Sequence, residues 1–247
     1  MPGSAENAGN RRCHDGIGWS KARPIPTPGA LVIQMYHELS ALLLPSVDLA
    51  GTAVFATSGA LAAARARQTP LTFAFFAVVT GIGGKTLSEL LMGAPVAWVH
   101  HPTNIVVCLV VALLAWSTPL TWWPNRAIDW FDAVGIAAYG AVGAANALTY
   151  GIPPLSAAIM GVFTACFGGV FRDVLAGEPS IILRPELYVT AAALAAGVFV
   201  VLTSFGMEPA VAVAVAFTMG FSLRALAIVK QLSLPSYRGR SGPMRDG

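Results

Sequence analysis

Two stretches of the chain place charged side chains beside pairs of glycines in otherwise apolar surroundings. They span residues 80–95 and 164–179, and each closes with a Gly-x-Pro sequence. A charge near the centre of a bilayer costs about 3 kcal/mol on the insertion scale, so it must face protein or water. If these segments cross a membrane, their residue types predict a polar path or a gate. The residues concerned are Thr80, Gly83, Gly84, Lys85 and Glu89 in the first stretch, and Thr164, Gly168, Gly169, Arg172 and Asp173 in the second.

The glycine pairs predict a weak point in each helix. Glycine tolerates kinks, and an interrupted helix frees carbonyl oxygens that can replace part of the water shell of a cation. Close packing of helices through small residues is the alternative interpretation. We favour a role in an ion pathway, because polar residues flank both pairs.

The charged residues allow two interpretations, a charged pore wall or gate, and a structural ion pair that locks the helices together. Lys85 and Glu89 are four residues apart, which allows them to pair with each other on one helix. A fixed positive charge repels cations. Lys85 and Arg172 are therefore better interpreted as gating or structural residues than as attractors.

Asp48 and Asp132 each stand at the start of an apolar segment. A carboxylate at a helix start is favoured by the helix dipole, and attraction of cations at a pore mouth is the alternative. Four further polar side chains lie inside apolar segments, where they either line a wet path or bond back to the preceding turn. They are Ser58, Thr80, Asn146 and Thr164.

The composition is that of a membrane protein. Of the 247 residues, 55% are hydrophobic and only 11% are charged, whereas a soluble domain carries roughly 25% charged residues. The basic residues lie mostly in loops and tails, which argues against a nucleic-acid partner. No nucleophile–base set, phosphate loop or dinucleotide fingerprint is present, so neither an enzyme nor a cofactor is expected. The three cysteines and the pair His100-His101 lack the spacing of a metal site.

Seven apolar segments predict an all-α protein with seven transmembrane helices. Residues 1–44 are expected to form a disordered extension with an interfacial helix before Pro45, and residues 230–247 a disordered basic tail. Lysine and arginine follow the odd-numbered segments, which predicts a cytoplasmic C-terminus and an N-terminus outside. The segments are 46–65, 71–92, 103–119, 129–149, 155–176, 185–205 and 209–229.

The chain contains an internal repeat with an offset of 84 positions (132 minus 48), and no gap is needed. The first unit spans 46–124 and the second 129–205, while segment 209–229 stands outside the repeat. An odd number of spans in each unit makes the second unit enter the bilayer from the opposite side. Inverted repeats of this kind are typical of proteins that move small solutes or ions. The matched pairs include Asp48 with Asp132, Gly51 with Gly135, Gly59 with Gly143, Thr80 with Thr164, Gly84 with Gly168, and Pro95 with Pro179.

The doubled pattern resembles the bacterial branch of the trimeric intracellular cation (TRIC) channel family. The resemblance is carried by Asp48, Gly51, Phe55 and Gly59 with 83–95, and by Asp132, Gly135, Tyr139 and Gly143 with 168–179. It implies a homotrimer with one potassium-permeable pore in each protomer, lined largely by the second and fifth spans. The same family contains bacterial members labelled as glycine transporters.

The first unit departs from the family pattern. The family commonly has a third glycine followed by Arg-Asp, and here those positions hold Lys85, Ser88 and Glu89. The second unit keeps Arg172-Asp173, although Phe167 replaces its first glycine. The changes in the first unit either replace the missing Arg-Asp function or alter conductance and gating.

The sequence thus predicts a multi-pass inner-membrane protein that passes monovalent cations, potassium above all, as a homotrimer. The pathway is assigned to the residues of the two glycine stretches, with Asp48 and Asp132 at its mouths and Ser58 and Asn146 as further lining. A secondary transporter of a small solute such as glycine is the alternative. A membrane scaffold without transport is a third possibility.

Overall fold

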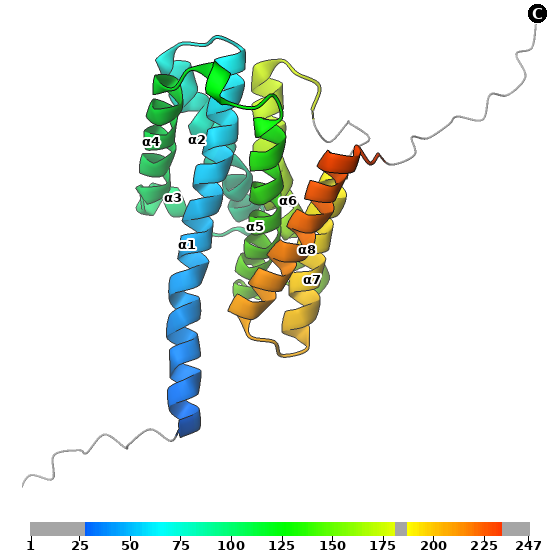
Figure 1. Ribbon diagram of the computed structural model, residues 1–247. Helices are drawn as coiled ribbons and strands as arrows, with labels where there is room; N and C mark the ends of the chain where they lie inside the picture. Colours follow the sequence, from blue (N-terminus) through cyan, green and yellow to red (C-terminus); the bar gives the residue numbers. More distant parts are fainter. Residues whose placement is uncertain (1–27, 181–186, 234–247) are drawn as a thin grey trace, which may run out of the picture.

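The computed structural model describes residues 28–180 and 187–233, with side chains from Pro45 onward. The regular elements in this part of the chain are helices (Figure 1). They are α1 (Pro28–Arg65), α2 (Pro70–Met92), α3 (Ala97–His100), α4 (Thr103–Ser117), the 3-10 helix η1 (Leu120–Trp122), α5 (Ala127–Thr149), α6 (Pro154–Ala176), α7 (Tyr188–Ser204) and α8 (Pro209–Lys230).

Each apolar segment expected from the sequence overlaps one helix. By length and composition, 5 helices in the described residues can cross a membrane, while α4 and α7 are shorter apolar helices. Because α1 begins at Pro28 and continues through Pro45, the expected boundary at that proline is wrong. A proline inside a helix removes one backbone hydrogen bond, and α1 continues past that point. Residues 1–27 and 234–247, where disorder is expected, lie outside the described residues.

Local sequence signals fix the ends of the long helices. Proline occupies the first turn of α2, α6 and α8, where a missing N–H is harmless. The glycines of the two Gly-x-Pro sequences, Gly93 and Gly177, end α2 and α6 with φ of 68° and 69°. Since this left-handed conformation suits glycine, the doubled motif acts first as a helix stop.

The helices form two groups that meet at the centre of the molecule. In Figure 1, α2 and α4 lie on one side of α1, and α7 and α8 lie on the far side of α5 and α6. One apolar cluster joins α1, α2 and α4, and another joins α5 to α8. A third cluster contains Phe55 of α1 with Ile136 and Tyr139 of α5. This central cluster is where the two groups pack together.

Glycines bring the central helices into backbone contact. A Cβ on Gly84 of α2 would overlap the carbonyl oxygen of Thr164, and one on Gly168 of α6 would lie 2.6 Å from that of Thr80. Both helices are continuous through their glycine pairs, so the expected interruption is wrong. Close packing through small residues, the alternative to a broken helix, accounts for these glycines.

A second pair of contacts also joins the two groups of helices, with a glycine contributed from each group. A Cβ on Gly51 of α1 would lie 3.1 Å from the Tyr139 ring, and one on Gly135 of α5 would lie 2.7 Å from the Phe55 ring. The two rings stack, with centroids 5.5 Å apart and planes 16° apart. Each group of helices therefore supplies one glycine and one aromatic ring to the other.

We expect Gly84→Ala to lower the free energy of unfolding by about 1–3 kcal/mol, because α2 and α6 must move apart. Gly197→Ala in α7 is the matched control, since a Cβ there meets no atom within 4 Å. That control should be neutral or stabilising by up to about 1 kcal/mol. Thermal unfolding in detergent measures both. Equal midpoints for the two variants would contradict the packing role.

Candidate functional site

Two cavities lie at opposite ends of the bundle. The Asp48 cavity, of about 280 Å³, includes Pro45 and Asp48 of α1 and the end of α5. The Arg172 cavity, of about 350 Å³, lies beside the end of α1, the start of α5 and the end of α6. Asp48 and Arg65, which line different cavities, are separated by about 25 Å along α1 at 1.5 Å per residue. The two cavities therefore approach the centre from opposite directions.

Asp48 and Lys85 form an ion pair beside the first cavity. Lys85 Nζ lies 2.6 Å from Asp48 Oδ2, and their side chains are 19% and 15% exposed. Asn104 Nδ2 donates a second hydrogen bond to the same oxygen at 3.3 Å. Asp48 lies in the interior of α1, so the expected helix start and capping role are wrong at this position.

Arg172 stands at the centre of a deeper network. Its Nη1 donates to both carboxylate oxygens of Asp132 at 2.6 Å, and its Nη2 donates to Asp173 Oδ1 at 2.6 Å. Ser58 Oγ donates to Asp132 Oδ1 at 2.7 Å. Arg172 and Asp132 are 3% and 0% exposed. A buried cation held by two carboxylates is compensated, whereas the same cation alone would be very costly.

The position of Asp132 differs from the expected pore mouth. It lies one to two turns inside α5 and is completely buried, so it neither caps its helix nor faces the surface. The ion pair with Arg172, and not a helix dipole, stabilises the Asp132 carboxylate. Of the two aspartates, only Asp48 lines a cavity.

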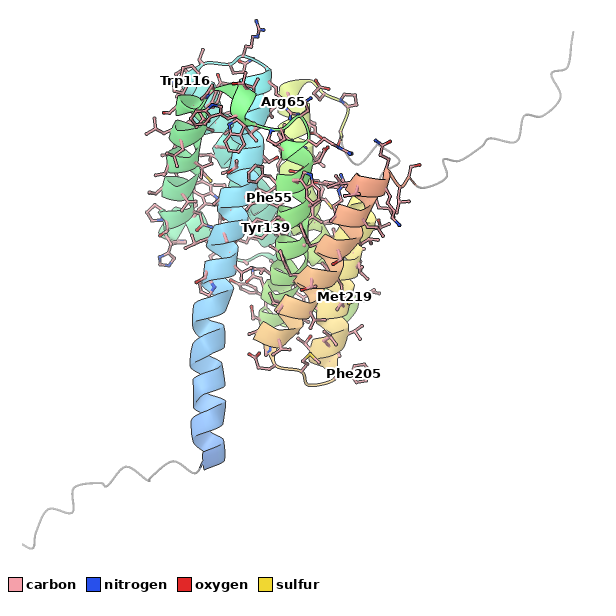
Figure 2. All side chains as sticks on the ribbon, viewed as in Figure 1. Phe55, Arg65, Trp116, Tyr139, Phe205 and Met219 are labelled. Atoms are coloured by element: carbon pink, nitrogen blue, oxygen red, sulfur yellow. The ribbon has the colours of Figure 1, made fainter. Side chains whose placement is uncertain are left out.

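Buried side chains fill the space between the two cavities. Figure 2 shows Phe55 and Tyr139 at the middle of the bundle, with Arg65 toward one end. Ser58, Thr80 and Thr164 are at most 4% exposed. Thr164 borders the Asp48 cavity and bonds back to the Met160 carbonyl oxygen. The bundle is therefore closed at its centre in this structure.

The remaining predicted residues occupy several different positions. Glu89 does not pair with Lys85, because its carboxylate accepts the backbone N–H of Ala97 at 3.1 Å, at the start of α3. Asn146 lines the Asp48 cavity. Gly83 packs against the ring of Phe171. Gly169 packs against the hydroxyl of Tyr188, and Thr80 lies at the contact between α2 and α6.

The two aspartates occupy matching positions of the repeat, but their cationic partners, Lys85 and Arg172, do not. Asp48 and Asp132 are 84 positions apart, but the position 84 before Arg172 is Ser88, which lies three residues after Lys85. Residues three apart lie on the same face of a helix, and both cations have long side chains. Lys85 therefore supplies the positive charge that Ser88 lacks, and it reaches Asp48 from one turn earlier.

Sequence reasoning missed several polar residues near these ion pairs. Asn104 contacts Asp48, and Tyr188, 84 positions later, lies near Asp132. The same offset that revealed the repeat could have found this pair. Arg224 is completely buried in α8, with its guanidinium carbon 5.5 Å from the Tyr188 ring centroid. A charge inside an apolar helix was the available signal for Arg224.

Comparisons with known proteins agree on one group of membrane proteins. The family model described as "Glycine transporter" matches residues 46–119 and 129–204. A "UPF0126 membrane protein" of Vibrio cholerae is 35% identical over 234 residues, which cover 90% of this chain and 95% of the relative. The "UPF0126 inner membrane protein YadS" of Escherichia coli K12 is 41% identical over 155 residues, which cover 61% of this chain and 74% of the relative.

A solved structure also matches the whole bundle. The trimeric intracellular cation channel orthologue from Rhodobacter sphaeroides superposes with a TM-score of 0.72 at 38% identity. The match covers 77% of this chain and 99% of that channel. The arrangement of helices described above is thus the fold of that channel.

We predict that the two ion pairs differ in their contribution to stability. Arg172→Met should cost about 3–5 kcal/mol, because it leaves two buried carboxylates uncompensated. Lys85→Met should cost about 1 kcal/mol, since Asp48 borders a cavity that admits water. Thermal unfolding of the purified protein measures both.

The double variant Asp132→Leu/Arg172→Met serves as the control. Removing Asp132 together with Arg172 leaves Asp173 as the one carboxylate without Arg172, so it should recover part of the stability that Arg172→Met loses. Equal losses of stability for Arg172→Met and Lys85→Met would show that the Arg172–Asp132 pair contributes no more than the Lys85–Asp48 pair.

Proposed function

Because the chain belongs to the TRIC channel family, whose repeated domain is described as a glycine transporter, we propose that it conducts monovalent cations. Potassium is the proposed principal ion, with one pore in each protomer of a homotrimer. Relatives described as inner membrane proteins support a location in the bacterial inner membrane. The helices long and apolar enough to cross a bilayer agree with that location.

The observation that carries the proposal is the pair of cavities on opposite ends of one bundle. The Asp48 cavity borders the contact between α2 and α6 at Thr164, and the Arg172 cavity lies farther along α6 at Arg172 and Asp173. The proposed path runs from the Asp48 cavity past Ser58 and the Phe55–Tyr139 stack to the Arg172 cavity. Carboxylates lie beside the path at both ends of this contact, where they lower the energy of a passing cation.

Arg172 is the proposed gate. Its guanidinium fills the space beside Asp132 and Ser58 in the closed centre. A second cation cannot enter there while this charge remains, because two positive charges in a buried site repel strongly. Opening therefore requires Arg172 to move, and the Arg172 cavity that it already lines offers the room.

An inverted arrangement of the two repeat units fits the reciprocal contacts at the centre. Gly84 with Thr164 and Gly168 with Thr80 are contacts that a two-fold axis would exchange. We propose units 46–124 and 129–205, with the seventh long helix outside them. The proposed orientation places the C-terminus and the Arg172 cavity on the cytoplasmic side, because Arg65, Arg126 and Lys230 lie at that end. A reporter fused to the C-terminus checks the orientation by its side of the membrane.

A secondary transporter of a small solute such as glycine is the second candidate. The description of the matching family favours it, as does a closed centre between two cavities, which alternating access also requires. A channel passes many ions per opening, whereas a transporter moves one load per conformational cycle. The two candidates therefore differ most in their currents.

In planar bilayers with potassium salt, we expect the purified protein to give discrete unitary currents. Under a potassium gradient the currents should reverse near the potassium equilibrium potential if cations are preferred. Arg172→Lys, which keeps the charge and loses the two-pronged contact, should alter open probability. Saturable glycine uptake into liposomes without unitary currents would instead establish the transporter.

A further inference from the structure

The hydroxyl of Tyr188, the first residue of α7, poses an energetic problem. The side chain is completely buried, yet the hydroxyl has no hydrogen-bond partner among the described residues. Leaving a buried polar group unsatisfied costs about 1–3 kcal/mol. A cost of this size points to a partner that arrives in another state of the protein.

The Tyr188 hydroxyl lies beside the ion pair of Arg172 and Asp132. A Cβ on Gly169 would overlap this hydroxyl and lie 3.7 Å from Asp132 Oδ2. The absence of a side chain at Gly169 therefore makes room for the Tyr188 hydroxyl next to the carboxylate. Arg172 holds that carboxylate now, through both of its oxygens.

The first repeat unit shows the contact that a polar residue at the position matching Tyr188 makes. Asn104 stands 84 positions before Tyr188, as Asp48 stands 84 before Asp132. Its amide donates to Asp48 Oδ2 at 3.3 Å and lies 3.3 Å from Thr52 Oγ1. At the equivalent position of the first half, a polar side chain thus contacts the aspartate directly.

Charge balance limits what can replace the guanidinium. The buried guanidinium of Arg172 lies between two buried carboxylates, those of Asp132 and Asp173. Arg224 lies over the Tyr188 ring, and this contact holds the ring in place. If Arg172 withdraws toward its cavity, one further positive charge restores the balance around Asp132.

We propose that Asp132, Ser58 and Tyr188 form a binding site for a partly dehydrated monovalent cation, which the guanidinium of Arg172 fills in the present state. The ligands are the two oxygens of the Asp132 carboxylate and the two hydroxyl oxygens. The site rests on the proposed channel function, because it places one ion-binding step on the conducting path. A divalent cation would leave an excess charge in the buried centre.

The first test uses Arg172→Met, which empties the site and leaves Asp132 without its cation. Potassium chloride should raise the thermal midpoint of this variant by several degrees over N-methylglucamine chloride, since an ion that binds only the folded state stabilises it. The wild type should show no such difference. The double variant Arg172→Met/Tyr188→Phe should lose most of the potassium effect. Equal midpoints in the two salts, or no folded protein in either salt, would overturn the site.

The second test uses Tyr188→Phe alone, which removes the hydroxyl and keeps the ring under Arg224. Its thermal midpoint should equal or exceed that of the wild type, because no hydrogen bond is lost. The unitary potassium current should nevertheless fall several-fold. Tyr139→Phe is the matched control for stability. Its hydroxyl contacts Thr52 Oγ1 at 2.6 Å and the Asp48 carbonyl at 3.1 Å, so its midpoint should fall.

The two tests separate the site from the channel. Unchanged current in Tyr188→Phe, with the wild type conducting, would overturn the site and leave the channel intact. Absence of current in the wild type would overturn the channel. The potassium dependence of Arg172→Met would still decide whether the cation site exists.

Discussion

The structure depends on one electrostatic constraint, which is that a charge inside a membrane bundle must be compensated by another. Arg172 lies at the centre and holds Asp132 and Asp173 at hydrogen-bond distance. Ser58 donates a hydrogen bond to Asp132, and α2 and α6 approach each other closely through Gly84 and Gly168. The helix ends, the glycines and the aromatic stack all serve to place these groups together.

The same requirement is met in the first half with other residues and lower burial. Lys85 reaches Asp48 from one turn before the position that matches Arg172, and both side chains are partly exposed. A partly exposed pair beside a cavity can break at lower cost, because water replaces the lost partner. The deep pair cannot, since its partners have no such replacement. The two ion pairs are therefore unequal, and under the proposed function the Arg172–Asp132 pair sets the barrier to opening.

Much of the fold could be predicted from local sequence signals, while the side-chain pairing could not. Apolar segments located the helices, because that signal depends on local composition. Helical spacing allows Lys85 to pair with Glu89. In the structure Lys85 pairs with Asp48 of α1, and Glu89 accepts a hydrogen bond from the backbone of α3. The glycine pairs predict interrupted helices, but in the structure Gly84 and Gly168 allow the backbones of α2 and α6 to come into contact. Tyr188, at the start of an apolar segment, would be expected at the membrane interface, but it is completely buried under Arg224, and the contact between the two side chains depends on tertiary packing.

The central claim is that cations pass the deep ion pair, and thiol labelling tests it most directly. Ser58→Cys, in a background without the three native cysteines, places a thiol beside Asp132 and Arg172. Ala195→Cys, equally buried in α7 but away from both cavities, is the control. The account predicts that a small cationic thiol reagent irreversibly reduces the potassium current of Ser58→Cys while channels are open, and leaves Ala195→Cys unchanged. Potassium current that persists unaltered through reagent-treated Ser58→Cys would show that ions take another route.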